Sequence, residues 1–141
     1  MQTLIDLFGT FEALGDKTAF VNRTGVRRLV VSYREFHELA LKMANLLAQQ
    51  GVAAGDRVLI WGPNSSWWAV AYWGIVIRGA VAVPVDFMSD LARAESIRGL
   101  TKAKLVLQSR FKPERMAAAD SLLLEDLQYL LEGVQPISAP A

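Results

Sequence analysis

The sequence contains no cysteine and a single histidine, His37. Disulfides and thiolate chemistry are therefore excluded, and a His/Cys metal site is not expected. With 15 basic and 14 acidic residues the net charge is only +1. This balance gives no electrostatic reason to expect nucleic acid or an anionic membrane surface as a partner. The lack of cysteine fits a cytoplasmic location, which we expect.

A membrane-targeting segment is also not expected. Residues Met1 to Gly9 carry no basic region before their apolar stretch, which argues against a secretory signal. Residues Val58 to Ile77 are uncharged over a length that could span a membrane, but the helix-breaking run Gly62-Pro63-Asn64-Ser65-Ser66 lies within them. We therefore interpret this stretch as a buried strand, a loop and a buried helix.

The order of the expected elements predicts an α/β fold. A helical spacing covers Leu4 to Leu14, and two β-favouring runs around Arg23-Thr24-Gly25 predict a small N-terminal hairpin. Strands and helices then alternate at short spacings, which predicts a mostly parallel sheet with flanking helices. The expected strands are Arg57 to Trp61, Ala80 to Val85 and Lys104 to Gln108, and the expected helices are Ser65 to Ile77, Leu91 to Leu100 and Leu122 to Leu131.

A further helix should begin at Ser32. Ser32 and Glu35 have the spacing of a capping box, and Gly51 is suited to the position after the helix end. His37, just inside this helix, is expected to face solvent or to be partly packed. With 52% hydrophobic residues the chain should form one folded unit. We assign residues 1–134 to this unit and 135–141 to a linker or tail.

Two longer motifs connect this pattern to a known family. Val31-Ser32-Tyr33-Arg34-Glu35-Phe36 and, later, Arg78-Gly79-Ala80-Val81-Ala82-Val83-Pro84-Val85-Asp86 resemble two motifs of adenylate-forming (AMP-dependent) synthetases and ligases. Between them, Gly55-Asp56-Arg57-Val58 and Pro63-Asn64-Ser65 match shorter family patterns in the same order. The chain therefore resembles the N-terminal part of such an enzyme, and more specifically of an acyl-CoA synthetase of fatty acid metabolism. The segment from Asp86 to Leu91 departs from the family's usual Asn-Pro, so no ligand contact is transferred to it.

The resemblance implies a reaction that we do not expect these 141 residues to perform by themselves. Members of the family activate a carboxylate with ATP and Mg²⁺ to an acyl-adenylate, and many pass the acyl group to coenzyme A. They use a Ser/Thr/Gly-rich loop that does not occur between Met1 and Ala141. We therefore expect a non-catalytic N-terminal fragment with no catalytic, cofactor-binding or metal-binding residue of its own. Its partner would be the remainder of the ligase domain, with self-association through exposed apolar surface.

Three aromatic residues remain candidates for a substrate-lining role. Trp67, Trp68 and Tyr72 lie in a helix that is apolar on nearly every face, although such a cluster more often belongs to a core. A loop such as Gly62 to Ser66 could bind an anion, but a single glycine favours simple helix capping by Asn64 or Ser65. An alternative to the fragment is a free-standing α/β module that acts as a split-enzyme subunit or regulatory binding protein. A Rossmann-type cofactor domain is a third alternative.

Overall fold

The computed structural model describes residues 4–15, 17–24, 27–112, 114–116 and 120–137. Its centre is a four-stranded, fully parallel sheet with strand order β4-β3-β5-β6. The strands are β3 (Arg57–Trp61), β4 (Val81–Val85), β5 (Leu105–Gln108) and β6 (Asp120–Leu123). The predicted α/β architecture with a parallel sheet is confirmed.

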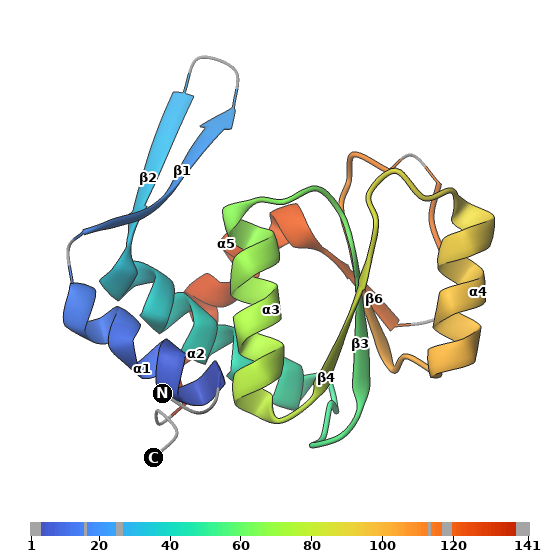
Figure 1. Ribbon diagram of the computed structural model, residues 1–141, viewed down its shortest axis with the longest axis horizontal. Helices are drawn as coiled ribbons and strands as arrows, with labels where there is room; N and C mark the ends of the chain where they lie inside the picture. Colours follow the sequence, from blue (N-terminus) through green and yellow to red (C-terminus); the bar gives the residue numbers. More distant parts are fainter. Residues whose placement is uncertain (1–3, 16, 25–26, 113, 117–119, 138–141) are drawn as a thin grey trace.

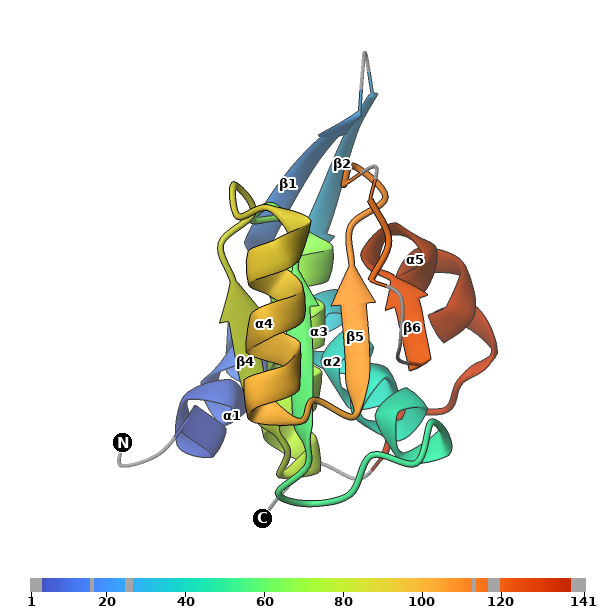
Figure 2. The same ribbon diagram turned by 90° about the vertical axis from the view of Figure 1, so that its right-hand side faces the viewer.

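Helices cover both faces of this sheet (Figures 1 and 2). Helix α3 (Ser66–Arg78) connects β3 to β4, and α4 (Leu91–Thr101) connects β4 to β5 on the opposite face. Successive residues of β3 point to opposite faces, so Val58 and Ile60 join the core under α3 whereas Leu59 and Trp61 join the core under α4. Burial on both faces explains why these strands are nearly continuous apolar runs.

Helix α2 (Tyr33–Gln49) packs on α3 and completes the larger core. Of the predicted capping box, the serine cap forms at the start of α2, where the Glu35 N–H donates to Ser32 Oγ at 3.1 Å. The Ser32 hydroxyl in turn lies 3.2 Å from the Glu35 carboxylate. At the other end Gly51 adopts φ 84°, and the Val52 N–H donates to the Leu47 carbonyl, which completes a Schellman motif.

The N-terminal elements pack at one side of this body. Helix α1 (Leu4–Leu14) ends at the predicted residue and inserts Phe8 against α2. His37 is more buried than expected, with 8% of its surface exposed, because its ring stacks on Phe8 at a centroid distance of 4.4 Å. Strands β1 (Thr18–Thr24) and β2 (Arg27–Ser32) form the predicted antiparallel hairpin, which projects away from the main sheet (Figure 1). Of the expected turn, Arg23 and Thr24 belong to β1, and Gly25 lies outside the described residues.

One predicted helix was wrong. Residues Leu122 to Leu131 do not form one helix: β6 ends at Leu123 and is followed by η1 (Leu124–Asp126), α5 (Leu127–Leu130) and η2 (Leu131–Gly133). A short leucine-rich run has no periodicity that separates strand from helix. Here pairing with the free edge of β5 decides the outcome, since Leu122 aligns with Leu107 in parallel register.

Two hydrogen bonds connect the residues after η2 to helix α2. Asn45 Nδ2 donates to the Gln135 carbonyl at 2.8 Å, and the Ile137 N–H donates to the Leu41 carbonyl at 3.5 Å. The remaining residues of the expected tail, 138–141, lie outside the described part of the chain.

Candidate functional site

The carboxyl ends of the four parallel strands meet at one edge of the sheet. The loops after β3, β4, β5 and β6 all begin there, and the Ser109 N–H after β5 donates to the carbonyl of Trp61 at the end of β3. In open α/β sheets, ligands bind in crevices outside this edge. We call these four loops the carboxyl edge and consider it the candidate site.

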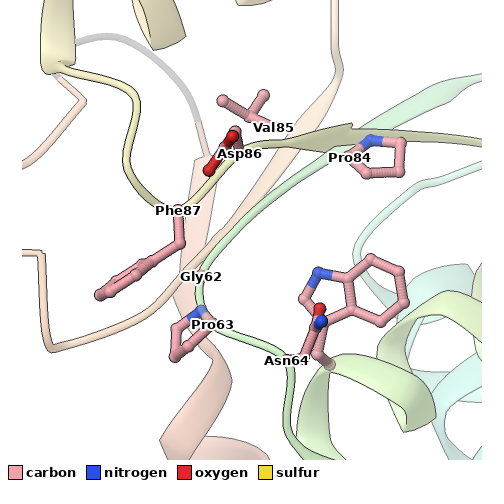
Figure 3. Close-up of a pocket in the computed structure, with 8 residues that line it drawn as sticks. Gly62, Pro63, Asn64, Pro84, Val85, Asp86 and Phe87 are labelled. Carbon is pink, nitrogen blue, oxygen red and sulfur yellow. The ribbon is translucent and has the colours of Figure 1, made fainter.

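A pocket of about 510 Å³ lies between the loop after β3 and the end of β4 (Figure 3). Gly62, Pro63 and Asn64 belong to the loop after β3, while Pro84 to Phe87 belong to the end of β4 and the start of the loop after it. Its lining residues are mostly apolar and include a single ionisable side chain, the exposed carboxylate of Asp86: Gly62, Pro63, Asn64, Trp68, Pro84, Val85, Asp86, Phe87. A cavity of this size is within the range of small-molecule sites.

Helix capping and close packing fix the conformation of the loop after β3. Ser65 Oγ accepts a hydrogen bond from the Trp68 N–H at 3.2 Å, so the predicted capping of this helix is confirmed. A Cβ atom at Gly62 would lie 2.7 Å from Leu124 Cδ1 and 3.0 Å from Ser109 Cβ. Glycine at this position is therefore explained by the approach of the loops after β5 and β6, without any phosphate group.

The loop after β4 is fixed by its own aspartate and by a lysine from the next loop. Asp86 Oδ1 accepts from the Met88 N–H at 2.9 Å. Lys112 Nζ donates to the Phe87 carbonyl at 2.7 Å. The same Nζ lies 4.8 Å from the ring centroid of Trp61 and 4.9 Å from that of Phe87, which are cation–π distances.

The loop after β5 is joined to the loop after β6 by charged and polar contacts. The buried Ser109 hydroxyl donates to Glu125 Oε2 at 2.8 Å, and the Arg110 N–H donates to Glu125 Oε1 at 2.6 Å. The Arg110 guanidinium also bonds Asp126 Oδ1 at 2.6 Å. Sequence reasoning missed this network, because Glu125 and Asp126 appeared to belong to a helix and no local pattern connects them to Ser109.

The three aromatic candidates have different surroundings. Trp68 lines the pocket. Tyr72 stacks on Trp68, with ring centroids 5.5 Å apart and planes 7° from parallel, and so supports the pocket wall from behind. Trp67 is half-buried and packs against the larger core, as Trp68 and Tyr72 also do, but it is not among the residues that line the pocket. Whether any of them contacts a substrate stays a prediction.

Within the described part of the chain there is no group of three or more His, Cys, Asp or Glu side chains that could hold a metal ion. The single charged group of the pocket, Asp86, would repel a triphosphate. None of the helices in the described ranges combines the length and the apolar character that crossing a membrane requires.

The fold and the carboxyl edge define an α/β unit of the adenylate-forming type. The sequence model of the AMP-binding enzyme family matches residues 9–137. The chain therefore belongs to the family of AMP-binding enzymes, the adenylate-forming ligases, as its two motifs predicted.

Individual relatives include both CoA ligases and peptide synthetases. The chain is 33% identical over 82 residues to 3-[(3aS,4S,7aS)-7a-methyl-1,5-dioxo-octahydro-1H-inden-4-yl]propanoyl:CoA ligase of Rhodococcus jostii, with 57% of this chain and 16% of the relative covered. It is 42% identical over 59 residues to enterobactin synthase component F of Shigella flexneri, with 42% of this chain and 5% of the relative covered. The chain thus spans a small part of the curated relatives that it matches.

Solved structures share the fold of the whole chain. The N-terminal domain of FACL13 from Mycobacterium tuberculosis superimposes with a TM-score of 0.80 at 22% identity, covering 100% of this chain and 38% of that one. At this identity the likeness concerns the fold alone. The chain corresponds to a fragment of these larger adenylate-forming domains.

Proposed function

We propose that the chain supplies the N-terminal scaffold of an ATP-dependent acid:thiol ligase that activates a carboxylate as an acyl-adenylate and transfers it to coenzyme A. One observation carries the proposal: the family match extends over residues 9–137, whereas the Ser/Thr/Gly-rich loop of the family does not occur in the 141 residues. The chain is then inactive by itself, and the chemistry requires the remainder of the ligase domain.

In this proposal ATP, Mg²⁺ and coenzyme A bind elsewhere in the complete domain. Adenylation is a substitution at the α-phosphorus, which requires donors and cations around the phosphates. The pocket offers the opposite character, a mostly apolar lining with the carboxylate of Asp86 as its single ionisable group. We derive no catalytic step from the residues of this chain.

The pocket is better suited to the apolar end of an acid substrate. Trp68 provides a flat apolar wall, and the neighbouring stack with Tyr72 holds that wall in place. The negative charge of Asp86 disfavours a carboxylate at the pocket, so the acid group would point away from it. The apolar character of the pocket supports an acyl-CoA ligase, and one relative is named as a CoA ligase, while other relatives are named as nonribosomal peptide synthetases. The absence of cysteine supports a cytoplasmic location.

Pyrophosphate exchange tests the scaffold role. The purified chain is incubated with ATP, Mg²⁺, labelled pyrophosphate and a panel of fatty, aryl and amino acids. We expect no exchange above the no-protein control with any acid. Acid-dependent exchange by the chain alone would contradict the non-catalytic assignment.

Two chimeras test the acid and acceptor classes. In the ligase chimera this chain replaces the matching N-terminal segment of the Rhodococcus jostii ligase, and in the synthetase chimera it replaces that of enterobactin synthase component F. We expect acid-dependent exchange and acyl-CoA formation from the ligase chimera and a weaker or absent reaction from the other. Trp68→Ala in the ligase chimera should raise KM for bulky apolar acids, whereas Trp67→Ala should leave acid preference unchanged. Activity in the synthetase chimera alone would exclude the acyl-CoA assignment.

A further inference from the structure

Aromatic rings form a continuous series of contacts from the pocket to helix α1. Tyr72 stacks on Trp68, the ring that lines the pocket, and also meets Trp73 edge to face, with centroids 5.7 Å apart and planes at 89°. Trp73 in turn meets Phe11 of α1 edge to face, at 5.3 Å and 85°. The pocket wall on α3 is therefore connected, ring by ring, to a helix whose described residues do not line the pocket.

The α1 end of this series is held on several sides. Phe11 lies 5.5 Å from the ring of Phe36 and 5.7 Å from that of Tyr33, both on α2. Phe8 is 1% exposed and lies 5.7 Å from Phe11 and 5.9 Å from Trp73. Phe8 and Phe11 are three residues apart and so share one face of α1. Two rings of α1 thus hold the indole of Trp73 from the side of α3 that faces away from the sheet (Figure 1).

The rings near the pocket need this support. Trp68 and Tyr72 are only half-buried on α3, so core packing by itself does not fix the orientation of either ring. Stacked and edge-to-face pairs have preferred geometries, and each such contact restricts the rotation of the two rings that make it. The orientation of the Trp68 indole therefore depends on Tyr72, that of Tyr72 on Trp73, and that of Trp73 on α1.

A fixed wall matters for a large apolar ligand and little for a small one. Ordering a side chain during binding costs free energy, so a wall that is already ordered binds a bulky group more tightly. A short acid has little apolar surface to place against the wall. Loosening the Trp68 indole should therefore weaken the binding of bulky acids selectively.

We propose that Phe11 is a positioning residue for the acid pocket: acting through Trp73 and Tyr72, it holds the Trp68 indole in the orientation that receives a bulky apolar acid. Helix α1 then contributes to acid preference without contacting the acid. The inference rests on the proposed function, because that assignment places the apolar end of the acid in this pocket.

The first experiment follows the rings in the chain itself. All four tryptophans are labelled as 5-fluorotryptophan, and the fluorine resonances of Trp68 and Trp73 are assigned by replacing each with phenylalanine. Phe11→Leu removes the ring but keeps an apolar side chain, and Phe11→Tyr restores a ring. Ile75→Val is the control, because Ile75 is fully buried on the same helix but lies in the core beneath it, outside the ring series.

We expect Phe11→Leu to shift or broaden the resonances of both Trp73 and Trp68. Phe11→Tyr and Ile75→Val should leave the Trp68 resonance in place. A change that stops at Trp73, or an equal change at Trp68 in Ile75→Val, would overturn the coupling between α1 and the pocket wall.

The second experiment measures acid preference in the ligase chimera. The bulky acid is the bicyclic propanoate after which the Rhodococcus ligase is named, and the small acid is propanoate, which lacks the bicyclic group. We expect Phe11→Leu to raise KM for the bulky acid about two- to tenfold, the usual effect of one aromatic contact, with kcat and the KM for propanoate unchanged. Phe11→Tyr should recover most of this loss, and Ile75→Val should change neither constant.

A double-mutant cycle decides whether Phe11 acts through Trp68. In a Trp68→Ala chimera, Phe11→Leu should no longer raise KM for the bulky acid. An unchanged rise in that background would contradict the proposal, as would a fall in kcat without a rise in KM. A failure of the proposed function looks different: Phe11→Leu still shifts the Trp68 resonance in the chain itself, but no acid supports exchange by the unmodified chimera.

Discussion

Gly74 on α3 lies directly against Met43 on α2. A Cβ atom at Gly74 would be 2.4 Å from Met43 Cγ and 2.6 Å from Met43 Cβ, with the Ala44 backbone nitrogen at 3.3 Å. Contacts under 3.0 Å to a Cβ atom cannot be relieved by a side-chain rotation alone. The approach of these two helices, which builds the larger core, therefore depends on the absence of a side chain at this position.

We expect Gly74→Ala to destabilise the fold by about 1–3 kcal/mol, the usual cost of overpacking a core. This cost outweighs the gain of up to about 1 kcal/mol that alanine brings to a helix interior. Urea unfolding followed by circular dichroism measures the difference.

Gly99→Ala is the matched control. Gly99 also lies in a helix, α4, but a Cβ atom there meets nothing within 4 Å. Only the gain in helix propensity should remain, so this variant should be more stable by about 0.5–1 kcal/mol. Equal effects at both positions would show that packing at Gly74 is looser than described.

Local sequence patterns were sufficient to predict most of the helices and strands. The bounds of α1 and β3 agree with the predicted Leu4 to Leu14 and Arg57 to Trp61, because apolar spacing and flanking turn residues fix them. Ser32, Ser65 and Gly51 act as expected caps, since capping depends only on nearby backbone groups. The family motifs then identified the fold before its strand order was known.

Features that depend on contacts between residues far apart in the sequence could not be predicted. Strand β6 exists because β5 offers a free edge, which the sequence around Leu122 does not reveal. For the same reason the contact of Ser109 with Glu125 could not be predicted. Helical periodicity placed Trp67, Trp68 and Tyr72 on one helix, but only the position of the β4 loop decides that Trp68 faces the pocket.

The carboxylate of Asp56 makes the stability of the fold depend on pH in the acid range. Its Oδ2 accepts the Ala53 N–H at 2.8 Å and lies 3.5 Å from Lys104 Nζ. The backbone hydrogen bond, assisted by the Lys104 charge, lowers the pKa of Asp56 below its ordinary value of 3.8. Because the pKa of Asp56 is lower in the folded state than in the unfolded state, its ionised carboxylate stabilises the fold at pH values above the ordinary pKa. This stabilisation is lost as the pH falls through the pKa of the folded state.

We therefore expect Asp56→Asn to lower the free energy of unfolding at neutral pH and to have a smaller effect as the pH falls below the ordinary value of 3.8. Urea unfolding across this pH range provides the measurement. Lys104→Met is the informative companion, because it leaves the Ala53 bond in place and should keep most of the pH dependence. If Lys104→Met removed all of it, the lysine rather than the backbone would be the main cause.

Lys102 occupies a backbone conformation that favours glycine. It ends α4 with φ 54° and ψ 44°, the left-handed region, and within the described residues it is the one non-glycine with positive φ. That conformation costs a residue with a Cβ atom roughly 1–2 kcal/mol. Lys102→Gly should raise stability by about 0.5–1 kcal/mol after the greater freedom of glycine in the unfolded chain is included.

Ala92→Gly serves as the opposite control for Lys102→Gly. Ala92 is exposed in the first turn of the same helix, where right-handed backbone gives glycine no advantage. This variant should lose about 0.5–1 kcal/mol. Thermal unfolding of both variants gives the comparison, and a loss of stability in Lys102→Gly would mean that its side chain contributes more than its strained backbone costs.

Lys112 connects the loop after β5 to the loop after β4. Its Nζ donates to the Phe87 carbonyl at 2.7 Å and lies over the rings of Trp61 and Phe87. Lys112→Met keeps the aliphatic stem but removes the charge, so it should destabilise the chain by about 1 kcal/mol. Lys112→Arg should lose less, because a guanidinium also stacks on aromatic rings.

The mobility of the loop after β4 distinguishes a specific contact of Lys112 with this loop from a general effect of removing a positive charge. In Lys112→Met, hydrogen–deuterium exchange should become faster at Phe87 and Met88, while the amides of β3 stay protected. Lys42→Met is the matched control: Lys42 forms an i,i+4 ion pair with Glu38 at 3.7 Å, and its loss should change stability by less than about 0.5 kcal/mol. Unchanged exchange at Phe87 in Lys112→Met would mean that Asp86, rather than Lys112, holds the loop after β4.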